Sequence, residues 1–400
     1  MIQSYDLAIV GGGIVGLTLA ASLADSHLSI ALIEGNTPNS LNDDGVGRVS
    51  AISFASQTVF EKLGIWQLLD TKRITAYNTM KVWDQDSAAK IDFDAKQVAR
   101  EQLGYIVENE QIERALLHTV ENQSNVTVYC PEKLTNIAIG DGESWLTLAS
   151  NKTLTAKLVV GADGADSWLR KKVDIPLVSW DYDHHAIVAT IKTELPHKNC
   201  ARQIFTPEGP LAFLPLFAQN LSSIVWSVAP EKATFLTGLS DSEFNKYLAR
   251  AFDNRLGACE VKSVRQSFPL TMRYARDFAK HRIALIGDAA HTIHPLAGQG
   301  LNLGLLDALS LAESIIANCE ADKDIGLYPN LRYFERWRKS EAAQMIAAME
   351  ILKRLFIGRN PIQKGARDLA LNFADKVSPL KKQFIKQAMG LTGELPNIVK

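Results

Sequence analysis

Cysteine is scarce in this 400-residue sequence, and its distribution excludes two structural roles. The four cysteines are Cys130, Cys200, Cys259 and Cys319. They form no CxxC pair and no cluster with histidine, so the sequence indicates neither a zinc site nor a disulfide framework. We therefore predict four reduced thiols, as is typical of a cytoplasmic protein, and no metal centre.

An excess of charge of one sign is also missing. Lys and Arg together number 43 and Asp and Glu 44, which gives a formal net charge of -1 at pH 7. The two signs are scattered rather than grouped in blocks, so the chain carries no electrostatic footprint for nucleic acid. A nucleic-acid partner is therefore not expected.

Long uncharged apolar runs are limited to one segment near the start of the sequence. Residues 7–24 carry no charge and are long enough for a membrane helix or the core of a signal peptide. However, no Lys or Arg precedes Arg48, and Gly11, Gly13 and Gly16 interrupt the run. We interpret the segment as a buried strand, a turn and a helix, and we expect no other stretch to span a bilayer.

The first 35 residues predict a βαβ unit. Residues 5–10 and 29–33 are apolar runs of strand length, and residues 14–23 fit a helix. Two further buried-strand signals, at residues 157–161 and 282–287, each end in a turn that contains aspartate. These three strand ends, although far apart in the sequence, can converge on one ligand.

The turn of the βαβ unit has the spacing Gly11-x-Gly13-x-x-Gly16, and Glu34 follows the second strand. Glycines at this spacing allow a tight turn and a close backbone approach to a ligand. The N-terminus of the helix attracts a pyrophosphate, and a carboxylate about 20 residues onward accepts a hydrogen bond from a ribose hydroxyl. The unit therefore predicts a dinucleotide site.

Two later motifs place polar and small residues at strand ends. In the segment 161–170 (GADGADSWLR), Asp163 either caps the following helix or serves a ligand. The segment 287–304 (GDAAHTIHPLAGQGLNLG) is dense in small and turn-forming residues. Such a run before a helix offers accessible backbone N–H groups and a positive helix end to a flat polar ligand.

Together the three motifs resemble those of the flavoprotein aromatic hydroxylases related to para-hydroxybenzoate hydroxylase, in the same order and over nearly the whole chain. Four stretches are similar to the ubiquinone-biosynthesis branch, and specifically to the 2-polyprenylphenol 6-hydroxylases, which act at ring carbon C5. These stretches are 180–186 (WDYDHHA), 251–257 (AFDNRLG), 268–276 (FPLTMRYAR) and 387–391 (QAMGL). Two alternatives stay open: a sister enzyme that acts at another ring carbon, and a non-catalytic flavin-binding assembly subunit.

The resemblance implies a reaction and a set of cofactor-binding residues. It implies that FAD is the cofactor, that NAD(P)H donates the electrons, and that O2 supplies the hydroxyl group added to a prenylated phenol. Asp288 would bind the ribityl chain, residues 298–302 would face the isoalloxazine ring, and Asp163 with Gly164 would serve both FAD and nicotinamide. The residues implied to contact FAD are Gly11, Gly13, Gly16, Glu34, Arg48, Asn109, Asp163, Gly164, Asp288, Pro295, Gly298, Gly300, Leu301 and Asn302.

The expected fold is α/β, with a Rossmann-like FAD-binding domain interleaved with a mainly antiparallel β-sheet substrate domain. Residues 80–93, 185–193, 202–205 and 222–228 have the β-rich character of such a sheet. We assign residues 1–75, 105–178 and 274–340 to the FAD-binding domain, and residues 76–104 and 179–273 to the substrate domain. Residues 341–400 form a C-terminal helical region, because the composition after about Leu301 favours helices.

The sequence identifies no catalytic base. His291, His294 and Pro295 lie in the flavin-loop motif, where a histidine either moves protons or orients the loop. A group of apolar residues in the expected sheet either lines a pocket for the prenylated ring or forms ordinary core, which is the more frequent outcome. This group is Phe205, Phe213, Leu214, Pro215, Leu216 and Trp226.

A basic amphipathic segment follows Pro379. One helical face is expected to carry Leu380, Phe384, Ile385, Ala388 and Met389, with Lys381, Lys382 and Lys386 pointing elsewhere. Such a segment either packs on its own domain or docks on a partner protein or an anionic membrane surface. The resemblance favours docking within a ubiquinone-biosynthesis protein assembly. We therefore expect a cytoplasmic protein and keep peripheral contact with the inner membrane as an open alternative.

Overall fold

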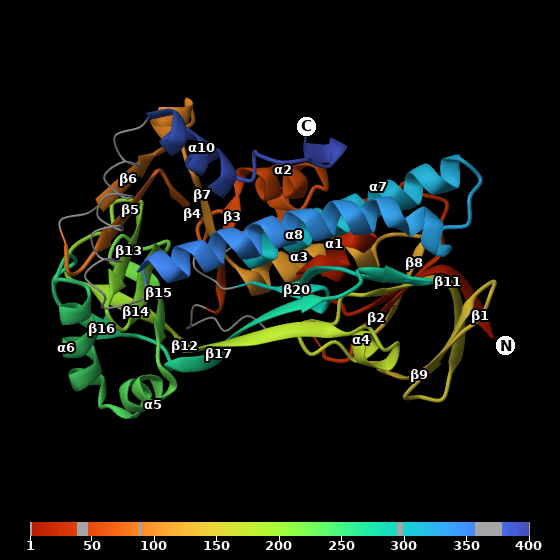
Figure 1. Cartoon of the computed structure of the whole chain (residues 1–400), viewed down its shortest axis with the longest axis horizontal. Coiled ribbons are helices and arrows are strands. Elements are labelled where there is room, and N and C mark those ends of the chain that lie inside the picture. Colours follow the sequence, from red (N-terminus) through yellow and green to blue (C-terminus); the bar gives the residue numbers. More distant parts are fainter. Residues whose placement is uncertain (1, 38–46, 88–89, 294–298, 357–377, 400) are drawn as a thin grey trace.

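The computed structural model describes residues 2–37, 47–87, 90–293, 299–356 and 378–399. In this part of the chain the strands form three sheets, of which the two large ones lie toward opposite ends of the molecule (Figure 1). The expected α/β fold, with one mainly parallel and one mainly antiparallel sheet, is confirmed.

The first large sheet is built from segments that are far apart in the sequence. Its central strands β2, β1, β11 and β19 are all parallel, and β8 continues this arrangement beside β2. The hairpin of β9 and β10 and the short strand β18 add antiparallel edges. The strands are β1 Gln3–Val10, β2 Ile30–Ile33, β8 Val126–Tyr129, β9 Leu134–Ile139, β10 Ser144–Leu148, β11 Thr153–Gly161, β18 Ala279–Lys280 and β19 Ile283–Leu285.

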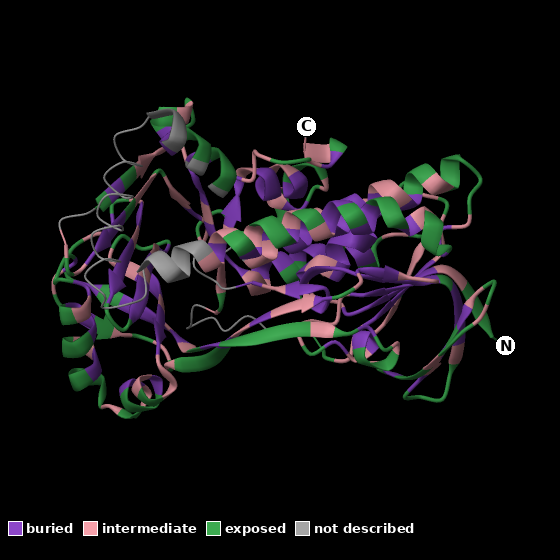
Figure 2. Ribbon diagram, viewed as in Figure 1, coloured by how far each residue is buried: buried purple, intermediate pink, exposed green. Residues whose placement is uncertain are grey.

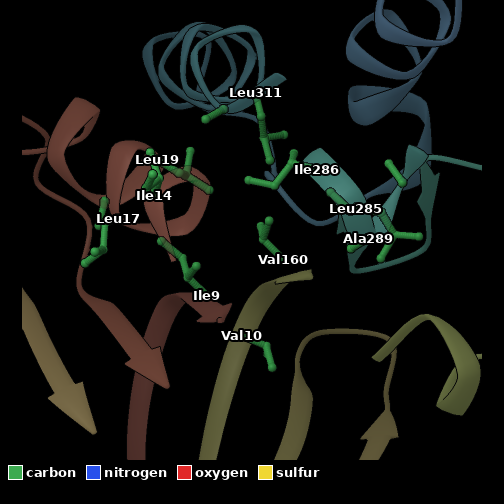
Figure 3. Packing of buried hydrophobic residues seen from close by; sticks show 14 of the residues in the cluster. Ile9, Val10, Ile14, Leu17, Leu19, Val160, Leu285, Ile286, Ala289 and Leu311 are labelled. Atoms are coloured by element: carbon green, nitrogen blue, oxygen red, sulfur yellow. The ribbon is translucent and has the colours of Figure 1, made fainter. Parts of the chain in front are cut away.

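The uncharged N-terminal segment forms β1, the glycine turn and helix α1 (Ile14–Ser22), as predicted. The second half of β1, residues 7–10, and most of α1 are apolar because they are buried between the neighbouring strands and helices, as in other parallel sheets. α1 packs against α3 (Asn109–Glu121) and α7 (Gln299–Glu320). Figure 3 shows side chains from β1, α1, β11 and α7 meeting in this core.

The second large sheet is antiparallel except for the pairing of β5 with β13. Its two long strands, β12 and β17, pair from Leu177 with Ala275 to Val188 with Gln266 and extend between the two ends of the molecule (Figure 1). The strands are β5 Thr79–Asp84, β6 Lys90–Asp94, β12 Leu177–Thr193, β13 Cys200–Thr206, β14 Gly209–Pro215, β15 Leu221–Val228, β16 Cys259–Val261, β17 Gln266–Ala275 and β20 His291–Thr292.

The two faces of this second sheet have different neighbours. One face packs against α5 (Pro230–Gly238) and α6 (Asp241–Ala251) in a separate hydrophobic cluster. The opposite face adjoins the main core, to which Ala186 of β12 belongs and against which Val225 of β15 packs. We call the latter the inner face.

A small third sheet and the remaining helices complete the described structure. β7 (Gly104–Glu108) lies between β3 (Val49–Ser53) and β4 (Thr75–Tyr77). The other helices are α2 Phe54–Lys62, α4 Trp168–Lys172, α8 Tyr328–Phe356 and α10 Ser378–Ala388, with short 3-10 helices η1 Trp66–Leu68, η2 Ala95–Val98, η3 Gly287–Ala289 and η4 Asn397–Val399.

Helix α7 corrects one sequence expectation. We expected no stretch after residue 24 to be apolar enough to span a bilayer, but residues 300–320 meet that test of length and composition among the described residues. The helix is apolar because it is an interior element: 61 % of its most apolar window is buried, and it packs against α1 and α8. Figure 2 shows buried residues concentrated where the helices meet the first sheet.

Helix α10 packs its apolar side against the protein. Ile385 and Met389 are 2 % and 1 % exposed and belong to a cluster with Ala95 and Leu103, so the internal-packing alternative holds for these two residues. The expectation that Lys381 points away is wrong, because Lys381 lies one turn before Ile385 on the same face and is also buried. The side chains of Leu380, Phe384 and Ala388 lie outside the described part.

Candidate functional site

The glycine turn brings β1, α1 and the end of β11 into backbone contact. Gly11 has φ of +110°, and a Cβ there would overlap the carbonyl oxygen of Ala162. A Cβ on Gly16 would overlap the carbonyl oxygen of Gly11. Both positions therefore require glycine for the chain to pack on itself.

Gly13 faces open space instead. It is the N-cap of α1, no side chain caps the helix there, and nothing lies within 4 Å of a Cβ built on it. The positive end of α1 is thus open on the side that the sequence assigns to a pyrophosphate. Beside it, Glu34 Oε2 accepts a hydrogen bond from Gly12 N–H at 2.6 Å and Oε1 accepts one from Asn36 N–H at 2.7 Å.

The second motif follows β11 and lies next to this turn. Asp163 Oδ2 accepts a hydrogen bond from Leu169 N–H at 3.0 Å, so the helix-capping role that the sequence left open is present. Its other oxygen, Oδ1, is buried without a hydrogen-bond partner. Gly164, with φ of +80°, has nothing within 4 Å of a Cβ position. One side of Asp163 therefore supports the fold and the other is available to a ligand.

The third motif begins with the 3-10 turn η3 after β19. Asp288 is solvent-exposed, whereas the flanking residues Gly287 and Ala289 are buried. Desolvation by the surrounding protein raises the pKa of Asp288, and the charges of His291 and Arg48 oppose that rise. A carboxylate that is reachable by solvent and yet partly desolvated is suited to bind hydroxyl groups of a ligand that fills the remaining space.

Arg170 connects the second and third motifs. It is 2 % exposed, and its guanidinium donates to the carbonyl oxygens of Ala289 at 2.7 Å and Ala165 at 2.8 Å. The sequence assigned no role to Arg170. Its position as the last residue of the conspicuous segment 161–170 was the available signal.

At the start of α7, the side chain of Asn302 is held by the protein itself. We expected residues 298–302 to face the flavin ring, but the side chain of Asn302 is 4 % exposed and binds β3 and α2. Its Oδ1 accepts from Ser53 N–H and Ser56 Oγ–H, and its Nδ2 donates to Ala51 O at 2.8 Å. Of its neighbours, Gly300 has open space at its Cβ position and Leu301 packs against the main core. His294, Pro295 and Gly298 lie outside the described residues.

Arg48 and Asn109 lie side by side although 61 positions separate them. The backbone N–H of Asn109 donates to the carbonyl oxygen of Arg48 at 2.9 Å, where β3 begins and β7 ends. Asn109 is the first residue of α3, and its Oδ1 is buried without a partner. The side chain of Arg48 is exposed. Both are free to meet a ligand held by the first motif.

His291 is an interior residue. It is 1 % exposed, and its Nε2 lies 2.6 Å from Oδ2 of Asp307, which in turn accepts from Arg338. Of the two roles left open by the sequence, orientation of the loop fits this buried position, whereas proton transfer would require contact with a ligand that a side chain 1 % exposed does not make in the protein alone. Asp307 and Arg338 were missed, although Asp307 is the only charged residue between Leu301 and Ala312.

The apolar residues proposed for a substrate pocket separate onto the two faces of the second sheet. Phe213 and Trp226 belong to the cluster with α5 and α6, where Phe213 stacks on Phe252. These two are ordinary core, so their assignment to a pocket is withdrawn. Phe205 and Leu214 alternate with members of that cluster along β13 and β14, which places them on the inner face. Pro215 and Leu216 are buried at the end of β14.

The arrangement fits FAD. An uncapped helix N-terminus beside an open glycine, a carboxylate at the end of β2, and the partnerless oxygen of Asp163 adjoin the carboxyl ends of β1 and β11. Asn109, at the start of α3, offers a second partnerless buried oxygen. Ligands of open α/β sheets bind at this edge. Among the described residues no group of three or more His, Cys, Asp or Glu side chains could hold a metal ion.

Solved structures similar to this one establish the fold. The p-nitrophenol 4-monooxygenase PnpA from Pseudomonas putida superposes with a TM-score of 0.80 at 19 % identity, covering 98 % of this chain and 100 % of that one. The flavin-dependent monooxygenase PieE, solved in complex with FAD and substrate, superposes with a TM-score of 0.69 at 16 % identity, covering 97 % of this chain and 71 % of that one.

Sequence comparison identifies closer relatives. The 3-demethoxyubiquinol 3-hydroxylase of Escherichia coli is 34 % identical over 391 residues, which cover 97 % of this chain and 99 % of the relative. Ubiquinone hydroxylase UbiL of Rhodospirillum rubrum is 36 % identical, covering 96 % and 89 %, and the human mitochondrial ubiquinone biosynthesis monooxygenase COQ6 is 34 % identical, covering 95 % and 92 %.

A family profile described as an FAD binding domain matches residues 4–328, which contain all three motifs. The match covers most of the chain, and the relatives align with nearly all of it. The chain therefore belongs to the family of FAD-dependent aromatic hydroxylases, and FAD is its cofactor.

Proposed function

We propose that this protein hydroxylates the ring of a polyprenylated phenol in ubiquinone biosynthesis, with NAD(P)H as electron donor and O2 as the source of the new oxygen. The observation that carries the proposal is its near full-length similarity to three ubiquinone-pathway hydroxylases. When bound, FAD supplies the electron transfer and the activation of O2. The residues of this chain bind and orient FAD, hold the phenol ring and exclude water.

The FAD-binding residues are assigned from their positions around the edge of the first sheet. The open N-terminus of α1 at Gly13 would hold the pyrophosphate, and Glu34 would accept from the ribose. Asn109 and Asp163 each offer a buried oxygen that lacks a partner, and Asp288 offers a carboxylate for the ribityl chain. In support of the proposed domain division, every strand of the first sheet lies within residues 1–75, 105–178 and 274–340.

The phenol ring is placed against the inner face of the second sheet. Phe205 and Leu214 provide apolar surface there, and Gln203 and Ser223 are buried polar side chains on the same face. An apolar pocket with a few polar groups is the usual way to bind and orient such a ring. Replacement of Ser223 by Ala is expected to raise KM for the phenol more than it lowers kcat, because the contact serves binding.

The cofactor assignment is tested by flavin content. Gly13→Glu places a carboxylate where the pyrophosphate would bind, and Asp288→Ala removes the ribityl acceptor, so both variants should fold but retain little FAD. Gly142→Glu is the matched control, because Gly142 lies in an exposed turn with open space at its Cβ position. Normal flavin occupancy in both test variants would refute the assigned site.

The ring position is tested by the intermediate that accumulates when the gene is deleted. We propose ring carbon C5, for which mass spectrometry should find a precursor that lacks oxygen at C5. The name of the E. coli relative favours a second candidate, in which a demethoxyubiquinol is hydroxylated. Accumulation of a demethoxylated quinone would select this candidate. Purified protein that binds FAD but shows no phenol-stimulated, product-coupled NAD(P)H oxidation would instead be the non-catalytic assembly subunit.

We also propose that α10 contacts pathway proteins or the anionic surface of the inner membrane through its exposed side. Lys382 and Lys386 are exposed, whereas Ile385 and Met389 face the protein. The double substitution Lys382→Glu/Lys386→Glu should weaken co-purification with pathway proteins, or flotation with anionic vesicles, and leave FAD bound. The control is the double substitution Lys171→Glu/Lys172→Glu on α4, which makes the same charge change at exposed positions on another helix. Equal behaviour of the two double variants would refute this contact.

A further inference from the structure

One carboxylate oxygen holds both ends of the turn that presents Asp288. Oδ2 of Asp307 on α7 accepts from the backbone N–H of Gly287 at 3.0 Å and lies 2.6 Å from Nε2 of His291. Gly287 begins η3 and His291, the first residue of β20, follows it, with Asp288 between them on the exposed side. The turn has no side-chain cap of its own, so Asp307 supplies this restraint from behind.

The other carboxylate oxygen binds the neighbouring helix. Oδ1 of Asp307 accepts from Nε of Arg338 on α8 at 2.7 Å, and the guanidinium also donates to Leu303 O at 3.4 Å. Asp307, His291 and Arg338 are each at most 1 % exposed. Burial alone would raise the pKa of Asp307, but the charges of His291 and Arg338 outweigh that effect and lower the pKa. Asp307 is therefore an ionised acceptor.

Because Asp307 is ionised, each hydrogen in the network belongs to the group that donates to it. A carboxylate accepts only, so the hydrogen between His291 and Asp307 belongs to Nε2 of the imidazole. The turn thus contributes two donors, Gly287 N–H and His291 Nε2–H, to one oxygen, and Arg338 supplies the compensating positive charge. Removal of the acceptor would leave both donors buried without a partner, and the turn would shift to regain hydrogen bonds elsewhere.

We propose that Asp307, neutralised by Arg338, is a positioning residue that fixes the turn 287–291 and thereby aims Asp288 at the FAD chain. The inference rests on the proposed contact between Asp288 and FAD. Asp307 does not touch the cofactor in this arrangement. It acts through the backbone of Gly287 and the ring of His291.

Two double variants separate the effect of the hydrogen-bond acceptor at position 307 from the effect of its charge. Asp307→Asn/Arg338→Gln has no charge but retains an oxygen that can accept from Gly287 and His291. Asp307→Leu/Arg338→Met is also uncharged, and apolar replacement of a buried ion pair commonly preserves folding, but it offers no acceptor. Measured by flavin fluorescence quenching on apoprotein, Kd for FAD should stay near wild type in the amide pair. It should rise about 10-fold in the apolar pair, which corresponds to about 1.4 kcal/mol.

A double-mutant cycle tests whether the effect passes through Asp288. In an Asp288→Ala background the apolar pair should cause no further loss of FAD affinity, because residues that act through one another are non-additive. Asp324→Asn is the stability control: Asp324 also pairs with a buried arginine, Arg282, but follows the far end of α7. It should lower the unfolding midpoint without changing Kd for FAD.

Three outcomes would overturn the inference. The first is wild-type FAD affinity in the apolar pair, and the second is an equal loss of FAD affinity in the amide and apolar pairs. The third is that the losses of FAD affinity caused by the apolar pair and by Asp288→Ala add up fully. Each leaves the proposed function standing as long as Asp288→Ala alone weakens FAD binding. Wild-type binding by Asp288→Ala would remove both assignments. If the apolar pair does not fold, Asp307→Asn alone should weaken FAD binding and addition of Arg338→Gln should restore it, and a lack of restoration would overturn the inference.

Discussion

Ser53 donates its backbone N–H to Oδ1 of Asn302 at 2.9 Å, across 249 positions of the sequence. This bond joins the N-terminus of α2 to the first turn of α7, and the amide group of Asn302 also donates to Ala51 O. Asn302→Ala would leave these buried backbone groups without partners, so we expect it to lower the free energy of unfolding by about 2–4 kcal/mol. Urea denaturation measures this loss. Asn245→Ala, which removes one bond to Val261 N–H at a half-buried site, should cost about 1 kcal/mol. Equal losses in the two variants would contradict the role of Asn302.

Gly11 and Gly13 should respond differently to the same added methyl group. In Gly11→Ala the Cβ overlaps Ala162 O and the backbone has φ of +110°, so the apoprotein should be strongly destabilised or fail to accumulate. In Gly13→Ala the Cβ enters open space at φ of −74°, so the apoprotein should be as stable as wild type. The same methyl group would then approach the proposed pyrophosphate and weaken FAD binding. Thermal unfolding of apoprotein and flavin titration together check both statements, which fail if Gly13→Ala is the less stable variant.

Neighbouring residues Phe213 and Leu214 should affect different properties because they lie on opposite faces of β14. Phe213→Ala removes a buried ring from the cluster with α5 and α6 and should cost about 3–5 kcal/mol of stability with little change in KM for the phenol. Leu214→Ala should cost less stability and raise KM. Denaturant unfolding and steady-state kinetics make the comparison. A larger KM effect from Phe213→Ala would place the substrate on the other face.

The raised pKa of Asp288 predicts that the cofactor site lowers the stability of the apoprotein. Because the folded-state pKa lies above the unfolded value of about 3.9, ionisation is disfavoured in the fold and the penalty is present at neutral pH. Asp288→Asn should therefore stabilise apoprotein at pH 7 while weakening FAD binding. The gain should shrink as pH falls through the raised folded-state pKa and should vanish below about 3.9, where the carboxyl group becomes protonated in both states. The urea unfolding midpoints of wild-type and Asp288→Asn apoprotein across this pH range measure the gain in stability. A gain that does not change with pH, or a loss of stability at pH 7, would contradict the prediction.

Local sequence patterns predicted the parts of the site that local chemistry determines. The positions of Gly11 and Gly13 follow from the turn that joins β1 to α1, and that of Glu34 from the end of β2, so spacing within one βαβ unit places all three. Arg170 and Asp307 could not be placed in this way. Each is defined by a partner in a different motif, Ala289 for Arg170 and Gly287 for Asp307, and long-range pairs of this kind leave no periodic signal.

The error at Phe213 has a different origin. A strand directs successive side chains to opposite faces, so Phe213 and Leu214 could not both line one pocket. That alternation is readable from the sequence. Which face receives α5 and α6 is not, because it depends on how residues 230–251 return across the sheet. The side-chain partners of Asn302 were not predictable for a related reason, since they lie on β3 and α2 rather than near it in the chain, and its contact with FAD stays a prediction.

The order of strands in the first sheet has a consequence for biosynthesis. β1 is translated first, yet its neighbour β11 ends at residue 161 and the next strand, β19, ends at residue 285. During synthesis the ribosome must therefore release more than two-thirds of the polypeptide before β19 can pair with β11 and the turn that carries Asp288 can form. Most strands of the second sheet, from β5 to β17, emerge before that moment. Capture of the cofactor by the nascent chain is consequently a late event, because the N-terminal glycine turn, although flanked early by β2 and β11, must wait for the Asp288 turn, which is made long after it.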